Sequence, residues 1–225
     1  MTESPMRINT DFTKPVELHP SDTSLSPSPA SGVNRTMLDR IGDEVARATT
    51  IVQFDRDKYF PEHTHDGGEE FFVLEGTFSD QYGDFPAGTY VRNPIGTSHS
   101  PHTVEGCTIF VKLWQFDKND TEQKSVNTND KSLWTESDHK EQTVLNLHEF
   151  ESEKVTLQKW AANAKAELTA PEKGMEVLVV RGELKSNGRT FPKRSWLRYP
   201  TGTEVNYDFT NDTTLLVKTG HLGEV

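Results

Sequence analysis

The sequence predicts an all-β protein built from two similar small barrels in tandem. Short runs rich in β-branched and aromatic residues alternate with turns that contain Gly, Pro, Asn or Asp. The second half of the 225-residue chain repeats the first half without a gap. A polar stretch, residues 117–141, separates the halves and is typical of a linker. We therefore expect an N-terminal arm at residues 1–32, one barrel at 33–116 and a second at 142–225.

Composition narrows the classes of partner. The chain has 24 Lys and Arg against 35 Asp and Glu, a net charge of −11, which argues against binding to nucleic acids or anionic membranes. No stretch approaches the roughly 20 apolar residues of a membrane span, and the N-terminus lacks the features of a signal peptide. The single cysteine, Cys107, excludes an internal disulfide. These features predict a cytoplasmic protein.

The elements can be justified in chain order. Residues 1–32 mix polar residues with Pro and Ser, which predicts a loosely packed arm with at most one short edge strand at 16–18. Glycine-containing turns at residues 41–44, 66–68, 82–84 and 94–96 then separate strand-like runs. The strand candidates of the first half are Thr36–Arg40, Ala46–Phe54 and residues 70–78, 88–92 and 107–116.

The internal repeat defines the second half. An offset of 106 residues carries Gly76 onto Gly182 and preserves the turn residues and apolar positions between them. The matched segments include Phe85-Pro86 with Phe191-Pro192, Pro94-Ile95-Gly96-Thr97 with Pro200-Thr201-Gly202-Thr203, and Val111-Lys112 with Val217-Lys218. A repeat of this length indicates two copies of one structural unit rather than a solenoid of short repeats.

Four residues of the first half form a candidate metal site. His63 and His65 are two residues apart, so on a strand both imidazoles point to the same face. Glu69 follows a glycine turn directly, and His99 follows a later turn. Three imidazoles and one carboxylate suit a divalent transition metal, and zinc, iron(II), manganese and nickel are all compatible.

The same offset removes all four candidate ligands from the second copy. Their equivalents are Thr169, Pro171, Met175 and Val205. Residues needed only for folding should often persist in both copies, as the turn glycines and prolines do. Glu70 also persists, as Glu176, which indicates a structural role for Glu70 and leaves Glu69 as the ligand. The prediction is one metal ion per chain and a second barrel without metal ligands.

The stretch from Pro61 to Cys107 resembles the cupin family. The first cupin motif, G-x5-H-x-H-x(3,4)-E-x6-G, is met by His63, His65, Glu69 and Gly76. The second, G-x5-P-x-G-x2-H-x3-N, is met by Gly88, Pro94, Gly96 and His99. Asp57 and Thr103 depart from the motifs, and neither stands at a ligand position. The resemblance implies a double-stranded β-helix, the RmlC-like jelly roll, and the repeat then implies a bicupin.

A narrower resemblance is carried by the runs MLDRIGDEVARAT, HTHDGGEEFFVLEG, GDFPAG and VRNP. They look like the cupins related to the ChrR anti-sigma factor and to acetylacetone dioxygenase. The set of His63, His65, Glu69 and His99 is similar to the zinc site of the ChrR-type cupin, which makes zinc the first choice of metal. In that family a small helical zinc domain precedes the cupin and captures a sigma factor. Residues 1–35 do not match such a domain, so direct sigma-factor binding is not expected.

Three functions are compatible with this pattern. The first is a cupin that binds or senses a small molecule at a metal centre of three histidines and one glutamate. The second is a metal-dependent dioxygenase that acts on a diketone or a similar small chelating substrate. The third is a structural zinc site without small-molecule chemistry. A small molecule is the expected partner in the first two, and a homodimer stays open in all three.

Overall fold

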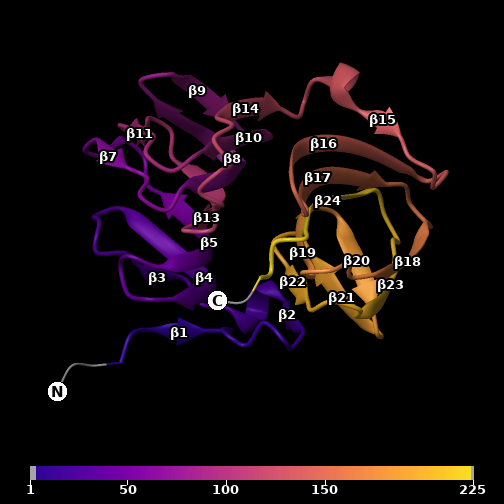
Figure 1. Ribbon diagram of the computed structural model, residues 1–225. Helices are drawn as coiled ribbons and strands as arrows, with labels where there is room; N and C mark the ends of the chain where they lie inside the picture. The colour runs from indigo at the N-terminus through magenta and orange to yellow at the C-terminus, as the bar shows by residue number, and fades with distance from the viewer. Residues whose placement is uncertain (1–3, 224–225) are drawn as a thin grey trace. The chain divides into compact units, whose positions relative to one another are not determined.

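The computed structural model describes residues 4–223, which form mostly strands (Figure 1). They divide into two compact units. One contains the residues up to Thr10 together with Thr23–Asn129, and the other contains Asp11–Asp22 together with the residues from Asp130 onward. Neither of the two short helices within residues 4–223 has the length or the apolar composition to cross a membrane.

The first unit contains a large antiparallel sheet and a two-stranded sheet. The main path of the large sheet runs β1-β4-β5-β13-β8-β10-β14, and β11 pairs with β7 in the small one. The strands are β1 (Arg7–Ile8), β3 (Ser26–Pro27), β4 (Val33–Ile41), β5 (Arg47–Phe54), β6 (Lys58–Tyr59), β7 (His63–Thr64), β8 (Glu69–Asp80), β9 (Gly83–Pro86), β10 (Thr89–Asn93), β11 (Ser98–His99), β12 (His102–Thr103), β13 (Cys107–Leu113) and β14 (Lys124–Asn127).

The second unit contains a seven-stranded sheet, β15-β16-β17-β24-β19-β22-β2, and a four-stranded sheet, β18-β23-β20-β21. Its elements are β2 (Val16–Leu18), η1 (Pro20–Asp22), η2 (Lys131–Leu133), β15 (Thr135–Glu136), β16 (Gln142–Phe150), β17 (Glu153–Trp160), β18 (Lys165–Thr169), β19 (Met175–Arg181), β20 (Glu183–Ser186), β21 (Arg189–Pro192), β22 (Trp196–Tyr199), β23 (Glu204–Asp208) and β24 (Thr213–Thr219). Both units are antiparallel jelly-roll barrels, and the all-β expectation is confirmed.

The internal repeat is visible strand by strand. Under the same offset, β5 coincides with β17, β9 with β21 and β13 with β24 at both ends. The irregularities repeat as well. In the β13–β8 ladder the register shifts after Thr108, and in the β24–β19 ladder it shifts at the equivalent place, between Val179 and Arg181. The two barrels therefore share the same arrangement of strands and bulges.

A glycine lies beside each of these bulges because the chain needs a left-handed residue there. Gly76 has φ +71° and Gly182 has φ +76°. A side chain would also collide with the neighbouring strand, since a Cβ on Gly182 would lie 2.5 Å from the carbonyl oxygen of Asp212. The constraint is both conformational and steric.

Gly182→Ala should therefore destabilise the second barrel more than Gly188→Ala. Both glycines have φ near +75°, but a Cβ on Gly188 meets nothing within 4 Å. The backbone strain of about 1–2 kcal/mol is common to both variants, and the clash adds to it only at Gly182. Urea unfolding of the two variants measures the difference, and equal losses of unfolding free energy would refute the steric argument.

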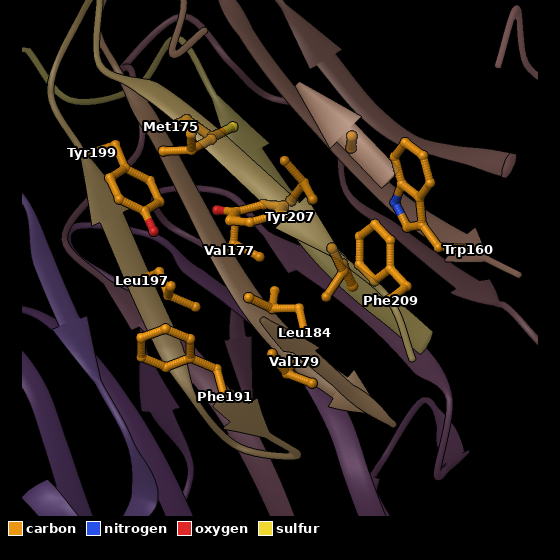
Figure 2. Packing of buried hydrophobic residues seen from close by; sticks show 14 of the residues in the cluster. Trp160, Met175, Val177, Val179, Leu184, Phe191, Leu197, Tyr199, Tyr207 and Phe209 are labelled. Atoms are coloured by element: carbon orange, nitrogen blue, oxygen red, sulfur yellow. The ribbon is translucent and has the colours of Figure 1, made fainter. Parts of the chain in front are cut away.

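Each barrel has its own apolar core. The first is built on Phe71, Val73, Phe78, Ile109 and their neighbours, and Cys107 lies in it as a buried thiol. Burial raises the pKa of that thiol to about 11, which fits a packing role rather than a nucleophilic one. The second core is the larger one drawn in Figure 2.

The chain divides differently from the predicted arm and linker. Strand β1 pairs with β4 and strand β2 pairs with β22, so the predicted arm contributes strands to both units. Strand β14, inside the predicted linker, pairs with β10. Strands β10 and β22 are repeat equivalents, so each barrel gains an outer strand from a segment outside the repeat. These segments are short and polar because an edge strand buries little side-chain surface.

Candidate metal centre

The local fold brings the four predicted ligands together. The short β7–β11 ladder places His63 directly opposite His99. The backbone of His65 continues this contact, since its N–H donates to Thr97 O at 2.9 Å and its carbonyl accepts from Gly96 N at 3.0 Å. Glu69 begins β8 after the glycine turn. Two antiparallel segments and one strand start thus converge on a single point.

The donor atoms have spacings suited to one ion. One ligand atom from each of His63, His65, Glu69 and His99 lies within 4.8 Å of the others. Glu69 Oε1 is 3.5 Å from His65 Nε2 and 3.6 Å from His99 Nε2. Two ligands at about 2.1 Å from a tetrahedral ion are roughly 3.4 Å apart. The arrangement therefore needs little movement to hold a metal.

Two of the imidazoles are fixed in one tautomer by oxygens that only accept. His63 Nδ1 lies 3.3 Å from the carbonyl oxygen of Pro61, and His99 Nδ1 lies 3.1 Å from Oδ2 of Asp80. A carbonyl and a carboxylate cannot donate, so both Nδ1 atoms carry the hydrogen. The lone pair of each neutral ring is then on Nε2.

The third imidazole is fixed through a hydroxyl group. His65 Nδ1 lies 2.9 Å from Thr97 Oγ1, and that hydroxyl donates its hydrogen to the carbonyl oxygen of Pro94 at 2.7 Å. Thr97 can therefore only accept from His65, which places the hydrogen on Nδ1 again. All three histidines present an Nε2 lone pair to the centre.

Nothing within the described residues satisfies the buried Nε2 atoms. Those of His65 and His99 are buried without a hydrogen-bond partner. They face each other and the carboxylate of Glu69, and all these groups are acceptors when Glu69 is ionised. Buried acceptors that point at one another are costly, and a bound cation would satisfy all of them at once. The residues present therefore fit a divalent metal.

The same burial shifts the pKa values of the candidate ligands. It lowers the pKa of His65 to about 3, with repulsion from His99 and His63 adding to the effect, and it lowers the pKa of His99. Burial raises the pKa of Glu69 to about 7, against the hydrogen bond from Asn93. Each shift favours the neutral group, so the contacts of Glu69 with His65 and His99 are not ion pairs at neutral pH.

Metal-free protein should lose stability because of Glu69 as the pH rises. The folded-state pKa of Glu69, about 7, lies above its ordinary value of 4.5. The folded protein therefore binds this proton more tightly than the unfolded chain, and the resulting stabilisation is lost as the pH rises from about 4.5 to about 7. Glu69→Gln removes the loss. Relative to the wild type, the variant should gain about 2–3 kcal/mol of unfolding free energy between pH 5 and pH 8. Urea unfolding with chelator tests this, and parallel pH profiles for the two proteins would contradict it.

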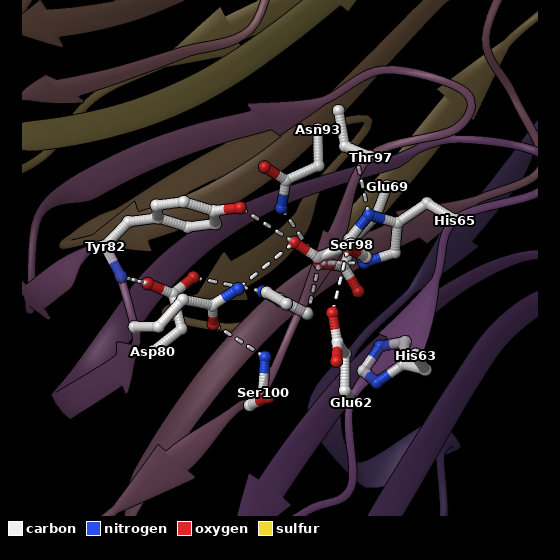
Figure 3. A network of polar contacts seen from close by, with 12 residues as sticks. Glu62, His63, His65, Glu69, Asp80, Tyr82, Asn93, Thr97, Ser98 and Ser100 are labelled. Atoms are coloured by element: carbon white, nitrogen blue, oxygen red, sulfur yellow. Dashed lines mark hydrogen bonds and ion pairs between the residues drawn. The ribbon is translucent and has the colours of Figure 1, made fainter.

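Asp80 belongs to the candidate site and was missed by the sequence analysis. Besides holding His99, its other carboxylate oxygen accepts the backbone N–H of Tyr82 at 2.7 Å, and the Tyr82 hydroxyl reaches Ser98 O at 3.4 Å (Figure 3). The hairpin between β8 and β9 is thereby attached to β11. The internal repeat could have revealed Asp80. Its equivalent in the second copy is Ser186, so this carboxylate is lost together with the four candidate ligands.

Asp80→Ala should weaken zinc binding about 10–100-fold, because the imidazole of His99 loses its orientation and fixed tautomer. Competition with a fluorescent zinc chelator measures the affinity. Ser186→Ala, at the equivalent position of the second barrel, is the matched control and should leave it unchanged. Wild-type affinity in Asp80→Ala would show that the contact has no role in the site.

The centre has one open side. His63 is exposed, whereas His65, Glu69 and His99 are 6%, 8% and 2% exposed. On the buried side, the ring of Phe78 lies 5.8 Å from that of His99 and belongs to the apolar core. A small molecule would therefore reach the centre past His63.

The second barrel has an apolar interior at the equivalent positions. Met175 and Val205 are 4% and 3% exposed and belong to the core cluster. Figure 2 shows Met175 in this core with Tyr199 and Tyr207. Tyr199 donates its hydroxyl to Glu17 Oε1 at 2.8 Å. Glu70 makes structural contacts, since its carboxylate accepts from the Tyr90 hydroxyl at 2.7 Å and lies 3.4 Å from the Arg92 guanidinium.

Residues 13–117 match the model of the ChrR cupin-like domain family. The chain contains a ChrR cupin-like domain. The matched range includes the four clustered residues and stops before the second barrel. No curated protein matches the chain significantly in sequence.

Solved structures support the same fold over both barrels of this cupin protein. A candidate dioxygenase of Nostoc punctiforme is similar with TM-score 0.72 and 14% identity over 100% of this chain and 86% of that one. Bacillus subtilis oxalate decarboxylase, with Mn(II) centres, has TM-score 0.62 and 13% identity over 100% and 79%. The Escherichia coli pirin YhhW, in complex with nickel(II), has TM-score 0.63 and 13% identity over 91% and 98%. At these identities the likeness shows the fold alone.

Proposed function

We propose that this cupin protein binds one divalent transition-metal ion through His63, His65, Glu69 and His99 and uses it to bind or sense a small molecule. The observation that carries the proposal is the convergence of three Nε2 lone pairs and a carboxyl group. Two of these Nε2 atoms are buried and have no hydrogen-bond partner among residues 4–223. Zinc is the first choice, and iron, nickel or manganese would fit the same donors.

The protein residues have separate roles in this proposal. Asp80 and Thr97 hold the rings of His99 and His65 so that Nε2 faces the centre. Asn93, 3.3 Å from Glu69 Oε1, steadies the carboxylate. Phe78 excludes water from the buried side. A bound ion would supply Lewis acidity, and a small chelating ligand would approach from the exposed side of His63.

A second candidate is a metal-dependent dioxygenase acting on a diketone or a similar small chelating substrate. The structural likeness to a candidate dioxygenase and the open side at His63 favour it. A purely structural zinc is the remaining alternative and requires all four residues to close the coordination shell. For all three functions we propose that the protein is cytoplasmic.

Elemental analysis of protein purified without chelators should find one metal ion per chain. His99→Ala should lose that ion because it removes a buried donor, and Val205→Ala, at the equivalent position of the second barrel, should keep it. Loss of metal from Val205→Ala, or two ions per chain in the wild type, would overturn the assignment to the first barrel.

X-ray absorption on the same samples separates the alternatives. Zinc with four protein ligands favours the structural interpretation. An ion with additional water ligands favours small-molecule binding, and iron in that state calls for an oxygen-consumption screen with diketones.

A further inference from the structure

The second barrel has a cavity of its own, far in sequence from the metal ligands. Its volume is about 430 Å³, within the range of small-molecule sites. It is lined by residues of the β15–β16 turn and by the adjoining ends of β17, β19 and β24. None of the four candidate metal ligands lines this cavity.

Two basic side chains share one wall of the cavity. Thr214 on β24 pairs with Lys159 on β17 and with Arg181 on β19. Direct partners across a sheet project from the same face, so both side chains flank the Thr214 hydroxyl. Their Cα atoms are separated by two strand spacings, about 10 Å, which suits one anionic group between two long side chains.

These two cations lack a carboxylate partner in the part of the chain that the structure describes. In residues 4–223 no ion pair forms with Arg181, and the ammonium group of Lys159 lies 3.5 Å from the ring centroid of Trp134. Partial burial lowers the pKa of Lys159, and repulsion from Lys131 and Arg181 lowers it further. The local potential at this wall is therefore positive, although the chain as a whole carries −11.

The first barrel provides an internal comparison. Its equivalent of Thr214 is Thr108, which pairs with Gln53 and Glu75 in the same register. The shared template therefore does not require cations at these two positions. Lys159 and Arg181 lie in the second barrel, which lacks the candidate metal ligands.

Three acidic residues also line the cavity, together with Lys140 and neutral polar residues. Asp212 accepts the backbone N–H of Ala162 at 3.0 Å, and Glu141 lies 3.2 Å from His139. Glu136 also lines the cavity. Carboxylates repel a polyanion but accept hydrogen bonds from hydroxyl or ammonium groups. The lining therefore favours a ligand with one anionic end and donor groups at the other.

We propose that this cavity binds a small organic anion, a molecule with one carboxylate or phosphate held by Lys159 and Arg181 and with hydroxyl or amino groups facing Glu136, Glu141 and Asp212. The site is independent of the metal centre and would give the chain a second ligand.

The test uses three probes that combine an anion with donors: D-gluconate, L-serine and glycerol 3-phosphate. Titration calorimetry, supported by tryptophan fluorescence, should show at least one of them binding with Kd below about 1 mM. Sorbitol, without an anion, and citrate, with three carboxylates, should bind at least about 10-fold more weakly. The carboxylate and phosphate probes distinguish the two sources of the anion.

Variants that copy the first barrel test the residues. Lys159→Gln and Arg181→Glu should each weaken the binding probe about 10-fold or more, because each removes a charged hydrogen-bond partner. Both side chains are exposed, so the fold should survive, and thermal unfolding checks this. Gln53→Ala and Glu75→Ala, at the equivalent positions of the first barrel, should leave binding unchanged. No binding by any probe at about 10 mM, or binding that persists in both charge variants, would overturn the proposal.

Discussion

The hydrogen bonds that the three Nδ1 atoms donate are the constraint on which the site depends. Each acceptor is supplied by a different segment: Pro61 before β7, Asp80 at the end of β8, and Thr97 in the turn before β11. Because these oxygens cannot donate to the rings, each histidine is held with its lone pair inward. The fold has thereby concentrated acceptors in a buried place, an arrangement that is stable only with a cation or with protons.

The two barrels show how one template serves different chemistry. Strand ends, a bulge and its glycine repeat almost residue for residue, because they are required to close the barrel. The interior and rim positions are free to differ. In the first barrel they hold imidazoles and carboxylates. In the second, Met175 and Val205 fill the interior, while Lys159 and Arg181 project at the rim. The second barrel thus has an apolar interior where the first has the clustered histidines, and it has a cavity of its own.

Segments outside the repeat add a strand to a sheet in each unit. Strands β14 and β2 pair with the equivalent strands β10 and β22, and both add to the sheet at a place where backbone groups would otherwise be unpaired. Each also places a residue opposite a buried arginine, Lys124 opposite Arg92 and Val16 opposite Arg198. Arg92 lies over the ring of Phe116 at 4.1 Å, and Arg198 lies over that of Phe12 at 4.2 Å. A domain division based on composition alone misplaces such strands.

The sequence by itself determined the all-β class, the two-copy organisation and the four clustered residues, because spacing on strands and an internal offset are local or periodic properties. It separated Glu69 from Glu70 through the second copy. The tertiary structure decided what depends on contacts between distant segments: the partner of His99, the pairing of the arm with both barrels, and the cavity beside Thr214. Asp80 is 19 residues from His99, and no short-range pattern connects them.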